Sequence, residues 1–381
     1  MKFSTLSVLF CIAFISITAS ANIIPYSDSR LATQHAPAKA IAENKRILAK
    51  NFANSYASSL VALRQHINQY DLSASVGDIY HSNKSKKLLS KSNHLIRTAK
   101  GLNANGENLI QLRMASKEMV TAWQNGEAPL FAFAPAGDEK QWTSIEAYDT
   151  DGNIHFLDVH ILPQQPVFIV EVNGRKALKE GIEIMRGIFS GGIAETPPQN
   201  TSRENAAQSL STSVLKHIRL NDDEEPWILG KAEIYAITNG ISPSRDEPVL
   251  DVVDMPYLDH DDTDYYPNQV LFHWSRYRWQ AADLMLMEHD ENTNFQEIAS
   301  NLLNLAVQIL QSIPFPDVQG YAIIAIITNG ILNALPAEWF INNDDYVDSI
   351  YTTFENQEYI NLSGARGNAT ITLKPLEIDS R

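Results

Sequence analysis

Apolar residues change their spacing along the chain, and each change marks a change in the predicted secondary structure. Over residues 41–70 the apolar positions recur every three to five residues, which predicts an amphipathic helix; they are Ile47, Phe52, Tyr56, Leu60, Leu63 and Ile67. Similar spacing predicts helices over 85–100 and 107–123. From Pro129 onward, short apolar runs instead predict strands at 130–134, 144–148, 154–162 and 166–172. Asp149 to Asn153, with its Asp-Gly pair, supplies the turn of a hairpin.

A segment rich in small and polar residues separates the two halves of the chain. Residues 190–212 contain Gly191-Gly192, Pro197-Pro198 and many serines and threonines, a composition typical of a linker. Beyond it, strand-like runs alternate with acidic turns, and two helical segments interrupt them. The predicted strands are 214–220, 232–237, 269–274, 283–287 and 368–373, and the predicted helices are 295–311 and 318–335.

These elements predict an α+β protein of several parts. We expect a signal peptide at 1–21, a helical N-terminal region at 22–125, a small antiparallel β unit at 126–189 and the linker at 190–212. An acidic β-sandwich-like domain with two inserted helices would then occupy 213–381.

The first residues have the features of a cleavable export signal. Lys2 supplies the positively charged N-terminal region of a signal peptide, and an apolar stretch follows it. Ala19-Ser20-Ala21 fits a signal peptidase site. The apolar stretch is too short to cross a bilayer, and we expect no transmembrane segment later in the chain. The sequence therefore predicts an exported protein, extracellular or periplasmic. Cys11 is the one cysteine and would leave with the signal, which excludes disulfides and thiolate chemistry from the mature chain.

Charge is distributed unevenly between the two halves. Residues 22–212 carry 20 Lys and Arg against 18 Asp and Glu, whereas residues 213–381 carry 9 against 27. Because so acidic a surface repels phosphate groups, we expect no nucleic acid partner. Residues 79–106 hold six basic side chains and no acidic one. This stretch is either a solvated helix face or a surface that docks onto the acidic half.

Four acidic clusters in the second half are candidates for metal binding. Each lies beside the end of a predicted strand or helix, and loops at one end of a β-sandwich can share an ion. Calcium takes six to eight oxygen ligands, so carboxylate-rich loops favour it over other cofactors. The candidate ligands are Asp222, Asp223, Asp259, Asp261, Asp262, Asp264, Glu288, Asp290, Asn292, Asn294, Asp344 and Asp345.

One of these clusters resembles a known type of calcium loop in part. Asp290, Asn292 and Asn294 reproduce the first three liganding positions of a loop that runs into a helix. However, Phe295 stands where that loop has glycine, and Asn301 where it has a bidentate glutamate. The alternative is that Asp and Asn residues here form turns and cap helices, as they often do.

An aromatic segment over 265–279 offers a second candidate surface. If it is a strand, Trp274, Arg276 and Arg278 share one face, and they could stack on a sugar or bind a partner's carboxylates. The alternative is that both faces are buried and the arginines pair with the protein's own acids. No complete catalytic motif is present: the sequence lacks His-Glu-x-x-His, and Ser190 is one position late for a nucleophile elbow. His260 and His289 lie near carboxylates, which leaves enzymatic activity open.

Several stretches of the C-terminal half resemble a known family. They are 218–227, 232–236, 255–259, 265–269 and 282–290. They are similar to an uncharacterised family of secreted bacterial proteins, known only as a domain of unknown function. The resemblance implies export but no catalytic residues.

Together these patterns favour a secreted, calcium-binding module that adheres to, or binds, a protein or glycan partner. The alternative is a secreted hydrolase, such as a peptidase, whose basic helical N-terminal segment masks the acidic half until it is removed. The sequence leaves the oligomeric state open.

Overall fold

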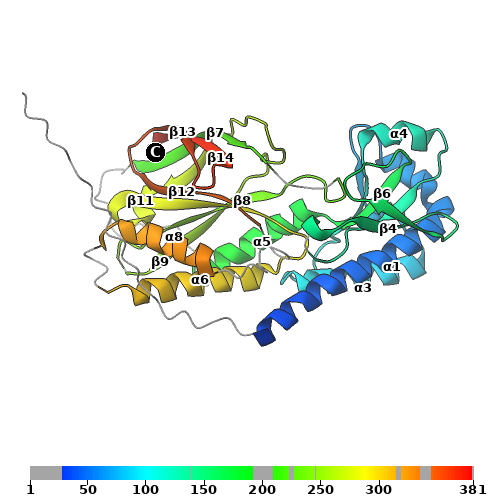
Figure 1. Cartoon of the computed structure of the whole chain (residues 1–381), viewed down its shortest axis with the longest axis horizontal. Helices are drawn as coiled ribbons and strands as arrows, with labels where there is room; N and C mark the ends of the chain where they lie inside the picture. Colours follow the sequence, from blue (N-terminus) through cyan, green and yellow to red (C-terminus); the bar gives the residue numbers. More distant parts are fainter. Residues whose placement is uncertain are drawn as a thin grey trace, which may run out of the picture.

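The computed structural model describes residues 28–137, 139–191, 209–222, 227–244, 246–314, 319–334 and 345–379. Two units lie side by side along the long axis of the molecule (Figure 1). The predicted signal peptide and residues 192–208 of the predicted linker lie outside the described residues. No helix within the described ranges is both long and apolar enough to span a bilayer.

The N-terminal unit is built on a six-stranded sheet in the order β1-β2-β6-β3-β4-β5. All neighbouring strands are antiparallel except β3 and β6, which are parallel. The strands are β1 (Ser73–Ser75), β2 (Ile110–Met114), β3 (Leu130–Ala132), β4 (Ser144–Tyr148), β5 (Ile154–Asp158) and β6 (Val167–Val172). The helices of this unit are α1 (Asp28–His66), α2 (Val76–Ile79), α3 (Asn83–Ala99), α4 (Lys117–Gln124) and the short η1 (Glu139–Gln141).

The predicted helix over 107–123 is wrong in its first half. Residues 110–114 form β2, in which Ile110, Leu112 and Met114 are buried and the residues between them are half-buried. This two-residue alternation places the strand in the sheet between β1 and β6. The helix α4 begins only after Ser116, whose side chain caps it by accepting a hydrogen bond from the N–H of Glu118.

The helical region therefore shares one core with the β unit. Helix α1 contacts β3, β4 and β6 and buries Leu48, Phe52 and Leu63, while Phe52 stacks on Tyr80 with ring centroids 4.4 Å apart. Removal of residues 22–125 would take β1 and β2 out of the sheet and expose this core. The fold thus argues against a removable N-terminal pro-segment.

The C-terminal unit contains two four-stranded antiparallel sheets, as the β-sandwich-like prediction requires. Their orders are β10-β7-β14-β13 and β12-β11-β8-β9. The first sheet is formed by β7 (Leu210–Leu220), β10 (Gln269–His273), β13 (Tyr359–Ser363) and β14 (Ala369–Ile378). The second is formed by β8 (Ile234–Ile241), β9 (Pro248–Asp254), β11 (Ala281–Glu288) and β12 (Asp345–Phe354). The turns η2 (Trp274–Arg276) and η3 (Arg278–Gln280) connect β10 to β11.

Helices cover the outer face of the second sheet, so the unit has three layers. Within β8, Ile234 and Ala236 belong to the core between the sheets, whereas Tyr235 and Ile237 belong to the core shared with the helices. This alternation explains why β8 and β11 are buried along their whole length. The covering helices are α5 (Gly174–Phe189), α6 (Phe295–Ser312) and α8 (Ala322–Ala334), seen below the sheet in Figure 1.

Helix α5 joins the two units. It follows β6 of the first unit directly, yet it packs against α6 and β9 of the second. Its α6 contact is so close that a Cβ added at Gly181 would lie 2.3 Å from the ring of Phe295. Glycine at this position therefore sets the distance between the two helices.

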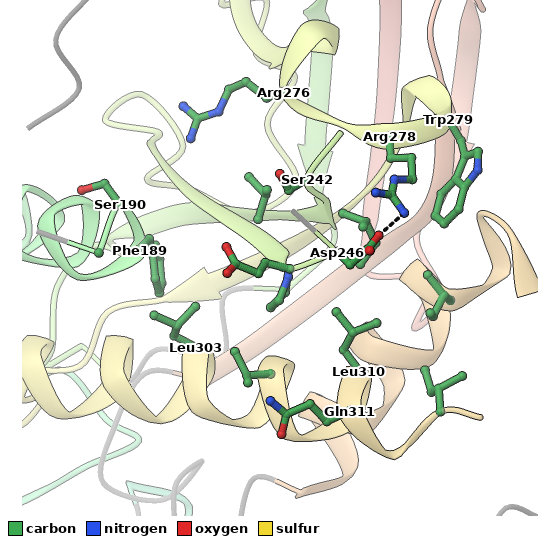
Figure 2. Close-up of a pocket in the computed structure, with 18 residues that line it drawn as sticks. Phe189, Ser190, Ser242, Asp246, Arg276, Arg278, Trp279, Leu303, Leu310 and Gln311 are labelled. Atoms are coloured by element: carbon green, nitrogen blue, oxygen red, sulfur yellow. Dashed lines mark ion pairs between the residues drawn. The ribbon is translucent and has the colours of Figure 1, made fainter. Parts of the chain in front are cut away.

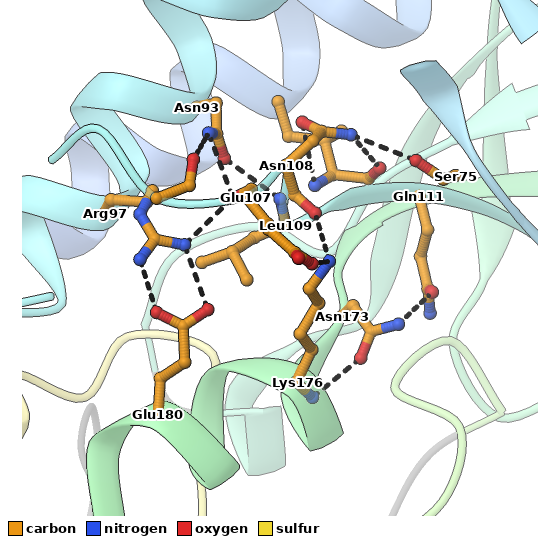
Figure 3. A network of polar contacts seen from close by, with 12 residues as sticks. Ser75, Asn93, Arg97, Glu107, Asn108, Leu109, Gln111, Asn173, Lys176 and Glu180 are labelled. Atoms are coloured by element: carbon orange, nitrogen blue, oxygen red, sulfur yellow. Dashed lines mark hydrogen bonds and ion pairs between the residues drawn. The ribbon is translucent and has the colours of Figure 1, made fainter. Parts of the chain in front are cut away.

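Polar side chains tie the start of α5 to the first unit (Figure 3). Arg97 of α3, which is 0% exposed, ion-pairs with Glu180 of α5 and donates to the carbonyl of Glu107 at 2.9 Å. Lys176 of α5 reaches Glu107 and the carbonyl of Asn108 at 2.5 and 3.3 Å. Because Arg97 is buried and its contacts are charge-assisted, we expect this network to hold α5 firmly.

One buried carboxyl lies beneath α8. Asp283 of β11 is 0% exposed and accepts a hydrogen bond of 2.7 Å from the N–H of Thr352. Thr352 has φ of 44°, a strained value for a β-branched residue, at a bulge between β11 and β12. Across the sheet, Asp283 is directly opposite Asn239, which donates to the hydroxyl of Thr328 in α8. The second carboxyl oxygen of Asp283 and the amide oxygen of Asn239 have no hydrogen-bond partner among the described residues.

Candidate functional site

The strand ends that adjoin the acidic loops lie together at one end of the sandwich. In the second sheet, Glu288 at the end of β11 is opposite Asp345 at the start of β12. In the first sheet, Leu220 at the end of β7 is opposite Ala369 at the start of β14. The carboxylate of Asp348 joins these two sheet ends, because it accepts hydrogen bonds of 2.8 Å from the N–H groups of Asn368 and Ala369. Loop 259–264 lies at the same end, since the N–H of Asp262 donates to the carbonyl of Leu220.

Within loop 259–264, three of the predicted metal ligands are paired with basic side chains. Asp259 ion-pairs with Lys231 at 2.5 Å, and Asp262 pairs with Arg219 at 2.7 Å. Asp264 lies 2.7 Å from His217, and its pKa is lowered chiefly by that hydrogen bond. Arg219 and Lys231 therefore supply positive charge beside two of these carboxylates, and the ring of His217 lies beside the third. Thr263 also donates to the carbonyl of Asp261, a contact that shapes the turn.

The loop over 288–294 receives positive charge from the N-terminal unit. Lys100 is 0% exposed, and its ammonium group donates to the carbonyl of Glu291 at 2.7 Å. Lys45 of α1 forms an ion pair with the Glu291 carboxylate, whose other oxygen accepts the N–H of Val172. Part of the basic stretch 79–106 therefore docks onto the acidic half through Lys100. The other lysines of that stretch, Lys84, Lys86, Lys87 and Lys91, are not buried.

The remaining candidates of the acidic clusters have local backbone roles or lie outside the described residues. Asn294 is the N-cap of α6 and accepts the N–H of Glu297 at 3.2 Å. Asp222 exchanges backbone hydrogen bonds with the Asn368 side chain. Glu288 is almost fully buried, and Asp290 and Asn292 are partly buried beside it. Asp223, Asp344 and the side chain of Asp345 fall outside the described part. Among the described residues, no three His, Cys, Asp or Glu side chains are grouped closely enough to hold a metal ion.

A cavity of about 890 Å³ lies at the opposite end of the second sheet (Figure 2). It is bounded by the end of α5, the turn between β8 and β9, residues 276–279 before β11, the last turns of α6 and the start of α8. Its size is within the range of pockets that hold small organic ligands. Apolar side chains from every one of these helices line it, including Phe189, Leu303, Val307, Leu310 and Ile323.

The rim of this cavity carries charged and aromatic side chains. Arg276 lies 3.1 Å from Asp251, and Arg278 forms an ion pair with Asp246. The guanidinium group of Arg278 also lies 5.6 Å from the ring centroid of Trp279. Trp279 has φ of 59°, and such strain in a bulky residue is more frequent at functional sites.

The predicted strand over 269–274 ends one residue early, so the predicted shared face of Trp274, Arg276 and Arg278 is wrong. Beyond His273 the chain forms the turns η2 and η3, and Trp274 is buried in the core between the sheets. Both arginines pair with the protein's own acids, as the alternative interpretation of this segment predicted. The cavity itself was missed, because five segments far apart in sequence form it. The arginine and tryptophan cluster was the one signal in the sequence that pointed there.

Residues 45–381 match a family model described as "Protein of unknown function (DUF3103)". The chain belongs to the DUF3103 family. The DUF3103 match begins within α1 and includes both units, so the cavity and the acidic end lie inside it. It confirms the resemblance to a domain of unknown function, while export stays a prediction. No curated protein and no solved structure matches the chain.

Proposed function

We propose that this protein is a binding module, acting outside the cytoplasm, that holds a largely apolar ligand in the cavity between α5, α6, α8 and the second sheet. The observation that carries the proposal is the cavity itself, about 890 Å³ and floored by aliphatic and aromatic side chains. Burial of apolar ligand surface against such a floor provides the main favourable free energy of binding.

The chemistry of the lining favours binding over catalysis. The described lining residues include no histidine, cysteine or lysine, and the titratable groups there are two arginines and two acids at the rim. Asp246 is already engaged with Arg278, and the hydroxyl of Ser190 donates to the carbonyl of Gly187 at 3.1 Å. A general base and an activated nucleophile in mutual contact are the usual requirements for hydrolysis, and this lining supports neither.

The test uses a pair of substitutions on α6. Val307 lines the cavity, so Val307→Trp should fill part of it, whereas Gln308→Trp adds the same ring on the exposed side of the helix. Binding of the amphipathic dye anilinonaphthalenesulfonate is measured by fluorescence titration on the folded protein. We expect Val307→Trp to weaken dye binding by about tenfold or more, the equivalent of about 1.4 kcal/mol. Equal affinity in both variants, with unchanged melting temperatures, would refute the proposal.

Calcium binding at the acidic end of the sandwich is a second candidate. It is supported by the position of the ends of β7 and β11, the start of β12 and residues 259–264 at one end of the sandwich, where carboxylate oxygens are available as ligands for a hard cation. Elemental analysis of the purified protein and calorimetry with and without a chelator test it. Calcium that binds only the folded state should raise the melting temperature. No bound metal and no shift with millimolar calcium would remove this candidate.

A further inference from the structure

Arg278 is held at the cavity rim by a partner that can be displaced. Its own side chain is only 23% exposed, whereas the side chain of its partner Asp246 is 75% exposed. Asp246 lies in the turn between β8 and β9, with φ of 47° in the left-handed region. By contrast, Arg276 pairs with Asp251, which is 28% exposed and part of the regular strand β9.

This difference has a physical consequence for the two ion pairs. A pair whose acid is mostly in solvent gains little net free energy, because water solvates the free carboxylate almost as well. A guanidinium group that is largely withdrawn from water still requires an anionic partner. Arg278 can therefore exchange Asp246 for another carboxylate at a small cost in free energy. The Arg276–Asp251 pair is harder to break than the Arg278–Asp246 pair, because Asp251 is less exposed than Asp246.

The neighbourhood of Arg278 fits a carboxylate attached to an apolar body. The guanidinium group lies beside the ring of Trp279, and the Arg278–Asp246 pair faces the apolar side chains of α6 (Figure 2). Trp279 and Gln280 both have positive φ, 59° and 48°, and Arg278 and Trp279 from this turn both line the cavity. A planar guanidinium group binds a carboxylate in a bidentate manner.

We propose that the cavity takes an amphipathic carboxylate, whose acid group replaces Asp246 on Arg278 while its apolar body fills the space between α6, α8 and the sheet. The carboxylate of Asp246 then occupies the position on Arg278 that the carboxylate of the ligand would take. This inference rests on the proposed function, and it adds the chemical class of the ligand and the residue that recognises it. Fatty acids and the free carboxyl end of an apolar peptide share this chemistry.

The experiment compares ligands that differ only in the acid group. Titration calorimetry measures decanoate against decanol, and the tripeptide Leu-Leu-Phe with a free carboxyl group against its amide. On the unaltered protein we expect the acid of the preferred pair to bind about tenfold more tightly than its neutral analogue, the gain typical of a charge-assisted contact. Which pair shows the preference identifies the source as a lipid acid or a peptide terminus.

Three variants test whether Arg278 is the residue that binds the carboxylate of the ligand. Asp246→Asn removes the competing carboxylate and should tighten binding of the acid about threefold to tenfold, with the neutral analogue unchanged. Arg278→Met should abolish the preference for the acid. Arg219→Gln is the matched control, since Arg219 pairs with Asp262 at the other end of the sandwich and does not line the cavity, and the preference should survive it. Arg276 lies apart from the Arg278–Asp246 pair in Figure 2 and is left unchanged.

The outcomes separate this inference from the proposed function. Equal binding of acid and neutral analogue, or an acid preference that Arg278→Met leaves intact, overturns the inference while the cavity stays a binding site. If neither ligand pair binds and the dye is also insensitive to Val307→Trp, the proposed function fails as well. Melting temperatures and binding of the neutral analogue show that each variant is folded.

Discussion

Replacement of Asp283 by asparagine should stabilise the protein at neutral pH, although Asp283 is a buried residue with specific contacts. Burial raises the pKa of this carboxyl from 3.8 to about 6, even though the backbone of Thr352 and the side chains of Thr328 and Thr352 oppose the rise. The protonated acid is a hydrogen-bond donor beneath α8, where the amide oxygen of Asn239, the residue directly opposite on β8, has no partner among the described residues. Asparagine at 283 has the same shape and the same donor, but it does not ionise.

The magnitude follows from the pKa shift. The folded state binds the proton more tightly than the unfolded state, so this group's contribution to stability is complete below pH 3.8 and is lost as pH rises through about 6. Each pKa unit corresponds to about 1.4 kcal/mol, so ionised Asp283 destabilises the fold by about 3 kcal/mol at pH 7. Asp283→Asn should recover about 1 to 3 kcal/mol there, allowing for imperfect amide geometry.

Urea unfolding between about pH 4 and about pH 8 measures this effect. We expect the gain of Asp283→Asn to be small at the acidic end and largest at the alkaline end. Asp348→Asn is the matched control: Asp348 is also buried, but its two oxygens accept four backbone N–H groups, from Ser349, Arg366, Asn368 and Ala369. Its amide would face two of those donors, so this variant should be destabilised. If Asp283→Asn is destabilised equally at every pH, Asp283 is not held as a neutral acid.

Three further predictions concern packing and charge. Gly181→Ala should cost about 1 to 3 kcal/mol in urea unfolding because its methyl group meets Phe295, whereas Gly187→Ala on the same helix, which meets nothing, should be neutral or stabilising. Lys100→Met should cost about 1 to 3 kcal/mol in the same assay, because the carbonyl of Glu291 loses its buried donor. Lys91→Met, on the exposed side of α3, should stay within about 0.5 kcal/mol, and equal losses would contradict the docking role of Lys100. Lys45→Met and Lys100→Met are measured singly and together by the same unfolding assay. Their losses in free energy of unfolding should be non-additive, since both lysines contact Glu291. Additive losses would mean that the two contacts act independently.

The sequence predicts secondary structure well where one face of an element is buried and poorly where tertiary contacts decide. The string Ile-Thr-Asn-Gly-Ile shows that five residues alone do not determine a conformation. At 237–241 it forms part of β8, at 327–331 it forms part of α8, and the two copies contact each other through Asn239 and Thr328. Identical local preferences thus give opposite conformations. The flanking residues differ and favour a strand at 232–237 and a helix at 318–335. The strands β9 and β11 pair with the first copy, and the second packs on the sheet as part of α8.

The candidate sites were likewise predictable where the order of strands places them, and not where distant tertiary contacts form them. The gathering of acidic loops at one end of a sandwich was predictable, because consecutive antiparallel strands return their turns to shared ends. Docking of the basic stretch through Lys100 was one of two alternatives that the sequence left open, but its partner Glu291, 191 positions away, was not predictable. Lys45, which is 246 positions from Glu291, and Arg219 were not predicted as partners. The cavity was equally hidden, because its floor consists of helix positions that look like ordinary core residues in the sequence.

The position of α5 has a consequence for synthesis on the ribosome. Its apolar face, formed by Ala177, Leu178, Ile182 and Met185, is made long before the α6 residues that cover it, which emerge roughly 120 positions later. At typical elongation rates this face waits on the order of ten seconds for its partner. During that interval the nascent chain exposes a hydrophobic helix, and a chaperone that recognises such a surface would protect it from aggregation.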